Sequence, residues 1–120
     1  MAKIRIKAKS VEMTAELNDS KTAKKLWEIL PCESKANRWG DEVYFNIPMK
    51  MDEEDAQAKA PSGAIAFWPP GDAFCIFFGQ TPYSPVNVVG HLDGEPKEFA
   101  KVKDGEKIRL ERAAGKMDLT

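Results

Sequence analysis

Two neighbouring segments of the chain are apolar at nearly every position, and no other feature constrains the fold as strongly. Residues 64–68 read AIAFW, residues 73–78 read AFCIFF, and the four residues between them are PPGD. A proline–glycine cluster between two such runs indicates a hairpin turn. A strand that is apolar on both sides is buried on both sides. The pair therefore predicts either the wall of a closed barrel with further chain packed outside it, or a sheet lined on both sides.

The remaining apolar segments predict further strands around this hairpin. Residues 3–9 and 11–17 alternate between apolar and polar side chains, and the outward face is basic in the first run and acidic in the second. This pairing of charges favours an antiparallel hairpin. Residues 42–47, 86–92 and 107–110 are also rich in strand formers. Roughly seven strands in one domain of residues 1–120 favour a mostly β fold, a closed barrel or a sandwich, because closure removes exposed sheet edges.

One helix is predicted, at about residues 20–30. Ser20 can accept a hydrogen bond from an amide of the first turn, and Pro31 ends the helix because it lacks an amide proton. The apolar residues between them follow the spacing of one helix face: Ala23, Leu26, Trp27 and Leu30. We expect this face to plug an apolar opening.

Residues 49–62 have no clear period and are predicted to form a long loop. Loops of this length in small domains are uncommon and are often functional. Its acidic run, residues 52–55, lacks the alternating oxygen ligands and the glycine of a calcium-binding loop. We therefore interpret the run as a solvated loop rather than a metal site.

Composition excludes several classes of function. The chain has 18 basic and 19 acidic residues, so its charge gives no reason to expect nucleic acid or an anionic membrane as a partner. No apolar run approaches the roughly 18 residues of a membrane span, and the alternating amino terminus does not look like a signal peptide. Two widely separated cysteines, Cys32 and Cys75, favour the reducing cytoplasm.

The single histidine, His91, leaves little room for metal or triad chemistry, so we expect no metal and no cofactor. Cys75 and His91 could in principle form a catalytic pair of nucleophile and general base. However, Cys75 lies inside an apolar strand, where a buried thiol behaves as a small hydrophobic group. Core packing is the better interpretation of Cys75.

Four stretches resemble a known family. Residues 37–45, NRWGDEVYF, resemble the N-x-W-G-[DE]-E-[IV]-Y-F signature of a family of small prokaryotic cyclophilin-like proteins of unknown function. Residues 68–82, WPPGDAFCIFFGQTP, resemble its W-P-P-G-x-A-[LF]-C-[IL]-F-F-G-x-T-P core, and NVVG at 87–90 and KDGEK at 103–107 resemble its last two landmarks. The resemblance covers nearly the whole chain. It implies a closed cyclophilin-like antiparallel β-barrel with one capping helix.

True cyclophilins are peptidyl-prolyl isomerases, with an apolar groove on the barrel wall and an arginine on an F-H-R strand. The segment that resembles this strand here is Val43-Tyr44-Phe45, which has no arginine, and the nearest one is Arg38 in the preceding loop. Isomerisation crosses a barrier of about 20 kcal/mol, which a cation near the prolyl nitrogen lowers. Without that arginine, we expect the groove to bind a ligand without efficient catalysis.

We predict an apolar, aromatic-lined cleft that binds a peptide or a small molecule. Tryptophan and tyrosine suit such a site because each has an apolar body and a polar group. Arg38 can also make a cation–π or carboxylate contact beside Trp39. One wall is predicted to contain Arg38, Trp39, Glu42 and Tyr44, and the opposite wall Trp68, Ile76, Phe78 and Pro82.

Three alternatives stay open at this point. Trp68 and Phe78 could be barrel core. The protein could be an unusual prolyl isomerase that uses Arg38 as its cationic donor. It could instead be a protein–protein interaction module that docks a partner through the 49–62 loop and an exposed Trp39. We expect a monomer or a weak homodimer.

Overall fold

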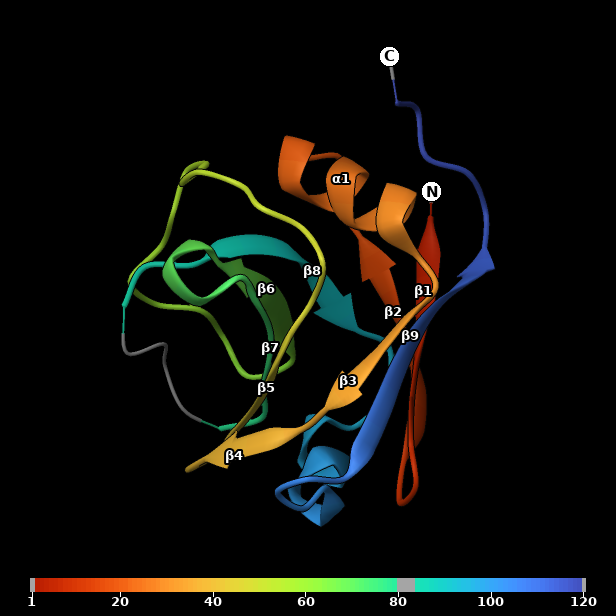
Figure 1. Cartoon of the computed structure of the whole chain (residues 1–120), viewed down its shortest axis with the longest axis vertical. Coiled ribbons are helices and arrows are strands. Elements are labelled where there is room, and N and C mark those ends of the chain that lie inside the picture. Colours follow the sequence, from red (N-terminus) through yellow and green to blue (C-terminus); the bar gives the residue numbers. More distant parts are fainter. Residues whose placement is uncertain (1, 80–83, 120) are drawn as a thin grey trace.

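A computed structural model describes residues 2–79 and 84–119. They form one nine-stranded sheet in which every pair of neighbouring strands is antiparallel, in the order β3-β9-β1-β2-β8-β6-β7-β5-β4 (Figure 1). The strands are β1 (Lys3–Ala8), β2 (Glu12–Leu17), β3 (Cys32–Lys35), β4 (Asn37–Trp39), β5 (Glu42–Asn46), β6 (Ala64–Trp68), β7 (Ala73–Phe77), β8 (Asn87–Leu92) and β9 (Lys107–Ala114). The helices are α1 (Lys21–Ile29) and two short 3-10 helices, η1 (Pro69–Gly71) and η2 (Pro96–Lys101).

The sheet is nearly closed into a barrel by the chain itself. Its two edge strands, β3 and β4, are consecutive in the sequence and are separated only by Ala36. Ala36 is fully buried; its amide donates to the carbonyl oxygen of Glu106 at 2.8 Å, and its own carbonyl accepts from Gly105 at 2.8 Å. The predicted mostly-β barrel is thus confirmed. The expectation that Arg38 lies in a loop is wrong, because residues 37–39 pair with β5 as strand β4.

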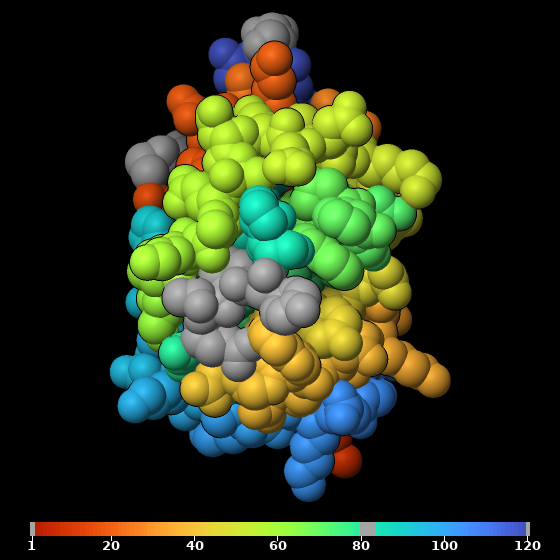
Figure 2. Space-filling view, turned by 90° about the vertical axis from the view of Figure 1, so that its left-hand side faces the viewer, coloured from red at the N-terminus to blue at the C-terminus, as the bar shows by residue number. Residues whose placement is uncertain are grey.

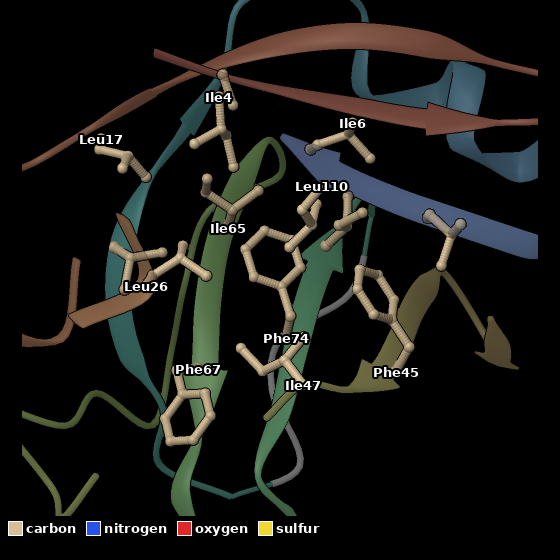
Figure 3. Packing of buried hydrophobic residues seen from close by; sticks show 14 of the residues in the cluster. Ile4, Ile6, Leu17, Leu26, Phe45, Ile47, Ile65, Phe67, Phe74 and Leu110 are labelled. Atoms are coloured by element: carbon tan, nitrogen blue, oxygen red, sulfur yellow. The ribbon is translucent and has the colours of Figure 1, made fainter. Parts of the chain in front are cut away.

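The hairpin of β6 and β7 is buried on both faces, as its two apolar runs predict. On the inner face, Ile65, Phe67, Phe74 and Ile76 belong to the main core, together with residues of β1, β2, β5, β9 and α1 (Figure 3). The outer face carries a second cluster, which we call the outer cluster: Ala60, Ala64, Ala66, Ala73, Cys75, Phe77 and Val86. The barrel wall therefore separates two apolar layers, and chain from the 49–62 loop packs outside it.

Short helices lie at the two ends of the barrel. Helix α1 lies over the upper end in Figure 1 and buries Ala23, Leu26 and Trp27. At the lower end, η2 buries Phe99 completely. The predicted helix is confirmed, with Ser20 as its N-cap: the Ser20 hydroxyl accepts from the amide of Ala23 at 3.1 Å. In the described part of the chain, no helix has the length and apolar character that crossing a membrane requires.

The 49–62 loop is attached to the barrel by a partly buried polar network around Thr22 and Asn87. The carboxylate of Glu54 accepts hydrogen bonds from the amides of Lys21 and Thr22 at 2.9 and 2.8 Å, and from the Thr22 hydroxyl at 2.7 Å. The side chain of Asn87, only 1% exposed, accepts from the Glu54 amide and donates to the Asp52 carbonyl, both at 2.9 Å. The interpretation of residues 52–55 as solvated is therefore wrong for Glu54, which caps helix α1.

Candidate functional site

A pocket of about 440 Å³ opens on the outer face of the barrel wall. It lies on the side of the molecule that Figure 2 views, where segments near residues 39–44, 68–72 and 84–86 meet. We call it the outer pocket. Its described lining residues come from β4, β5, β6, β7 and the segment before β8: Trp39, Glu42, Tyr44, Trp68, Cys75, Phe77, Ser84 and Val86. The volume lies within the range of roughly 300–1,000 Å³ that is usual for small-molecule sites.

Strand pairing places the central lining residues side by side. Glu42 of β5 lies opposite Trp39 of β4 on one side and opposite Phe77 of β7 on the other. Two residues along β5, Tyr44 lies opposite Cys75. Residues two apart on a strand share a face, and directly opposite residues have Cβ atoms about 5 Å apart. The register thus brings these five side chains onto one face.

Trp68 is held in place by its neighbours. It ends β6, and its indole N–H donates to the hydroxyl of Ser84. Its ring lies directly over Gly71, where an added Cβ would be only 2.5 Å from the Trp68 Cζ3 atom. Glycine is therefore required in the PPG turn for this close approach, and the turn and Ser84 together fix the indole as a wall of the outer pocket.

Glu42 is the acidic residue among the described lining residues. It is nearly buried, with 8% of its surface exposed. Burial raises the pKa of its carboxyl, and a hydrogen bond from Cys75 partly offsets this by lowering it. The pKa of the Cys75 thiol is raised well above its usual range, first by burial and then by the Glu42 charge and hydrogen bond. Cys75 is therefore an unreactive thiol at neutral pH.

A family model described as cyclophilin-like matches residues 2–111. The chain belongs to the cyclophilin-like family. Two solved structures agree with this assignment in fold. The solution structure of the hypothetical protein AF2241 from Archaeoglobus fulgidus is similar with a TM-score of 0.80 and 34% identity, over 93% of this chain and 95% of that one. The structure of McbB in complex with tryptophan is similar with a TM-score of 0.77 and 20% identity, over 98% of this chain and 48% of that one. No curated protein matches.

The cyclophilin-like barrel brings together four of the predicted site residues. Trp39, Glu42, Tyr44 and Trp68 all line the outer pocket. Trp39 is 46% exposed at the rim, which agrees with the expectation that it is accessible. Pro82 lies outside the described residues.

Arg38 does not belong to the outer pocket, so its predicted position in the cleft wall is wrong. Because residues 37–39 form a strand, consecutive side chains point to opposite faces, and Arg38 points away from Trp39. Its guanidinium donates to the carbonyl oxygens of Ala100, Val102 and Gly40 at 2.9–3.0 Å. The same group lies 5.0 Å from the centroid of the Phe78 ring. Arg38 thus ties β4 to the segment that closes the lower end of the barrel.

Ile76 and Phe78 are also misplaced by the sequence prediction. Both side chains lie in the main core, Ile76 completely and Phe78 nearly completely buried. A shift of one residue along a strand moves every side chain to the other face, so the pocket contains Cys75 and Phe77 instead. For Phe78, the open alternative of barrel core is the correct one, whereas Trp68 lines the pocket.

Sequence reasoning missed Cys75, Phe77, Ser84 and Val86 as lining residues. A usable signal was present in side-chain size. Along β6 and β7 the large residues Ile65, Phe67 and Phe74 alternate with small ones, and the small residues face outward. No comparable signal marks Ser84 or Val86, which lie just before β8.

The described ranges 2–79 and 84–119 contain no cluster of side chains suited to bind a metal ion. Within them, no group of three or more histidine, cysteine, aspartate or glutamate side chains could hold a metal ion. His91 is exposed on β8 and is not among the described lining residues of the outer pocket.

Proposed function

We propose that this cyclophilin-like protein binds a small molecule or a peptide side chain in the outer pocket and does not catalyse prolyl isomerisation efficiently. The observation that supports this most strongly is the pocket itself, in which Trp39, Tyr44, Trp68 and Phe77 surround a space of about 440 Å³. Such a concave, mainly apolar site with a few polar groups is the usual form of a small-molecule site. The two cysteines are free thiols, which supports the cytoplasm as the compartment of this function.

The position of Arg38 argues against the isomerase alternative. An isomerase of this fold needs a cationic donor in the groove, and the guanidinium of Arg38 is instead engaged by three carbonyl groups on the other side of β4. None of the described lining residues is basic. The pocket can therefore hold an apolar group but offers no cation to polarise a prolyl amide.

The 49–62 loop supports the binding proposal more than a docking role. Gln57 and Val86 exchange backbone hydrogen bonds at 2.8 and 3.0 Å, and Val86 lines the outer pocket. Together with the Glu54 and Asn87 network, this fixes the loop onto the barrel. We therefore assign the loop the role of supporting one side of the pocket.

The test is an NMR titration of the 15N-labelled protein with 2-phenylethanol, an uncharged aromatic probe that is small compared with the pocket volume of about 440 Å³. We expect shifts centred on the amides of Tyr44, Cys75, Phe77 and Val86. Trp39→Ala should weaken binding several-fold, whereas Leu119→Ala, which removes an equally exposed apolar side chain outside the pocket, should not. The proposal is wrong if millimolar probe shifts no pocket amide. An exchange assay on an X–Pro peptide should give the uncatalysed rate, and clear acceleration would contradict the statement on catalysis.

A further inference from the structure

Glu42 is a buried acid that has no counter-ion among the described residues. Every ion pair found among the described residues joins other groups, so no lysine or arginine there neutralises Glu42. The guanidinium that is nearest in sequence, that of Arg38, lies on the opposite face of β4. Glutamate is rarely buried unless it is paired, because an ionised carboxylate loses its hydration. The outer pocket therefore contains a carboxyl group that no basic side chain of the described residues pairs with.

The walls around Glu42 are suited to a positive charge. Trp39 and Phe77 lie directly opposite Glu42 on the neighbouring strands, and Tyr44 follows two residues along β5. The face of an aromatic ring is electronegative and attracts an ammonium group, and tryptophan is the most effective ring. Trp68 adds a second indole to the same pocket. Four rings and one carboxylate, with no basic residue among the described lining, select against an anion and favour a cation.

We infer that the ligand of the outer pocket carries a protonated primary amine on an apolar body, with the ammonium group bound by Glu42 and the body packed between Trp39, Tyr44 and Trp68. This inference rests on the proposed function, since it names the chemistry of the ligand in the same pocket. The raised pKa of Glu42 fits the inference, because burial disfavours the ionised carboxylate and a bound ammonium group would stabilise it. The amine can belong to a free small molecule or to the amino terminus of a peptide.

The experiment compares three probes of nearly equal shape: 2-phenylethylamine, 2-phenylethanol and 3-phenylpropionate. They are cationic, neutral and anionic at pH 7, and none of them emits in the tryptophan window, so quenching of Trp39 and Trp68 reports binding. We expect the amine to bind at least about tenfold more tightly than the alcohol, because the amine adds a positive charge, and hence an ion pair with Glu42, to the hydrogen bond that either probe can donate. The anion should bind most weakly.

Glu42→Gln removes the charge while keeping the shape of the side chain. In this variant the amine and the alcohol should bind with about equal affinity, and an unchanged circular dichroism spectrum should show that the variant is folded. The control is Glu53→Gln, an exposed carboxylate in the 49–62 loop, which should leave the preference for the amine intact. If the wild-type protein binds the alcohol as tightly as the amine, the inference is overturned while the proposed function stands. If no probe binds, the proposed function itself fails.

A last pair of probes identifies the source of the amine. Phe-Gly-Gly amide carries the same amine on a peptide, and its N-acetylated form lacks the charge. Binding of the free peptide more tightly than 2-phenylethylamine would support the inference with a peptide amino terminus as the ligand. Weaker binding would support it with a free small amine.

Discussion

The attachment of the 49–62 loop to helix α1 leads to a sharp prediction about Glu54. A helix leaves its first four amides without intrahelical partners. Here the amides of Lys21 and Thr22 donate to the Glu54 carboxylate, while the amide of Ala23 donates to the Ser20 hydroxyl. One acidic side chain from a distant loop thus satisfies two of these amides. It also places a negative charge at the positive end of the helix.

We expect Glu54→Gln to lower the free energy of unfolding by about 2 kcal/mol. The hydrogen bonds to the charged carboxylate are each stronger than neutral ones. In the variant, the NH₂ group of the glutamine would also face a backbone N–H group, so that two donors oppose each other. For a domain of this size, about 2 kcal/mol corresponds to a fall of about 8 °C in Tm. The measurement is urea unfolding followed by circular dichroism. The matched control is Glu53→Gln, because Glu53 is exposed and should cost less than about 0.5 kcal/mol.

The pH dependence provides a second readout of the same contact. Burial raises the pKa of Glu54, but the hydrogen bonds from Thr22 and the two amides outweigh it, so the pKa lies below its ordinary value. A carboxyl with a depressed pKa adds stability above its unfolded pKa, about 4.3, and loses it as the pH falls through the folded pKa. The difference between wild type and Glu54→Gln should therefore be full at pH 7 and should shrink below about pH 4. Equal differences at pH 7 and pH 3, or an equal cost for Glu53→Gln, would refute the reasoning.

Two further predictions concern the barrel. Gly90→Ala should lower the free energy of unfolding in urea by about 3 kcal/mol or more, since its Cβ would lie 2.0 Å from the Glu16 carbonyl oxygen on the paired strand. Gly94→Ala is the control and should cost far less, because its Cβ meets only the flexible Met13 side chain. Similar losses of stability in the two variants would contradict the packing argument. Arg38→Met should lower the free energy of unfolding by about 2 kcal/mol, because three carbonyl groups lose their hydrogen-bond donor. It should leave the affinity for 2-phenylethanol unchanged, and a large loss of affinity would show that Arg38 belongs to the binding site.

Most strands of the barrel were predictable because their apolar side chains follow a regular pattern along the sequence. Strands β3 and β4 were missed because they show no such pattern. Residues 32–39 do alternate between more buried and more exposed positions, with Cys32, Ser34, Ala36 and Arg38 on the more buried side. These side chains are small or polar, so the run shows no hydrophobic period. Missing β4 had a direct consequence for the site. In a loop Arg38 and Trp39 can share a surface, whereas in a strand they cannot.

The position of the outer pocket also follows from the sizes of residues on one face of the wall. On β6 and β7 the inward positions carry Ile65, Phe67, Phe74 and Ile76, which fill the barrel. The outward positions carry mainly small residues: Ala64, Ala66, Ala73 and Cys75. Large residues on both faces would fill the outer layer as completely as the core, because interiors pack densely. Small residues leave the outer layer thinner than the core, and at Cys75 this layer borders the outer pocket, beside the larger rings of Tyr44, Trp68 and Phe77. Polarity cannot distinguish the two faces of such a hairpin, but the alternation of side-chain size can, and it assigns the pocket to the face of Cys75 and Phe77.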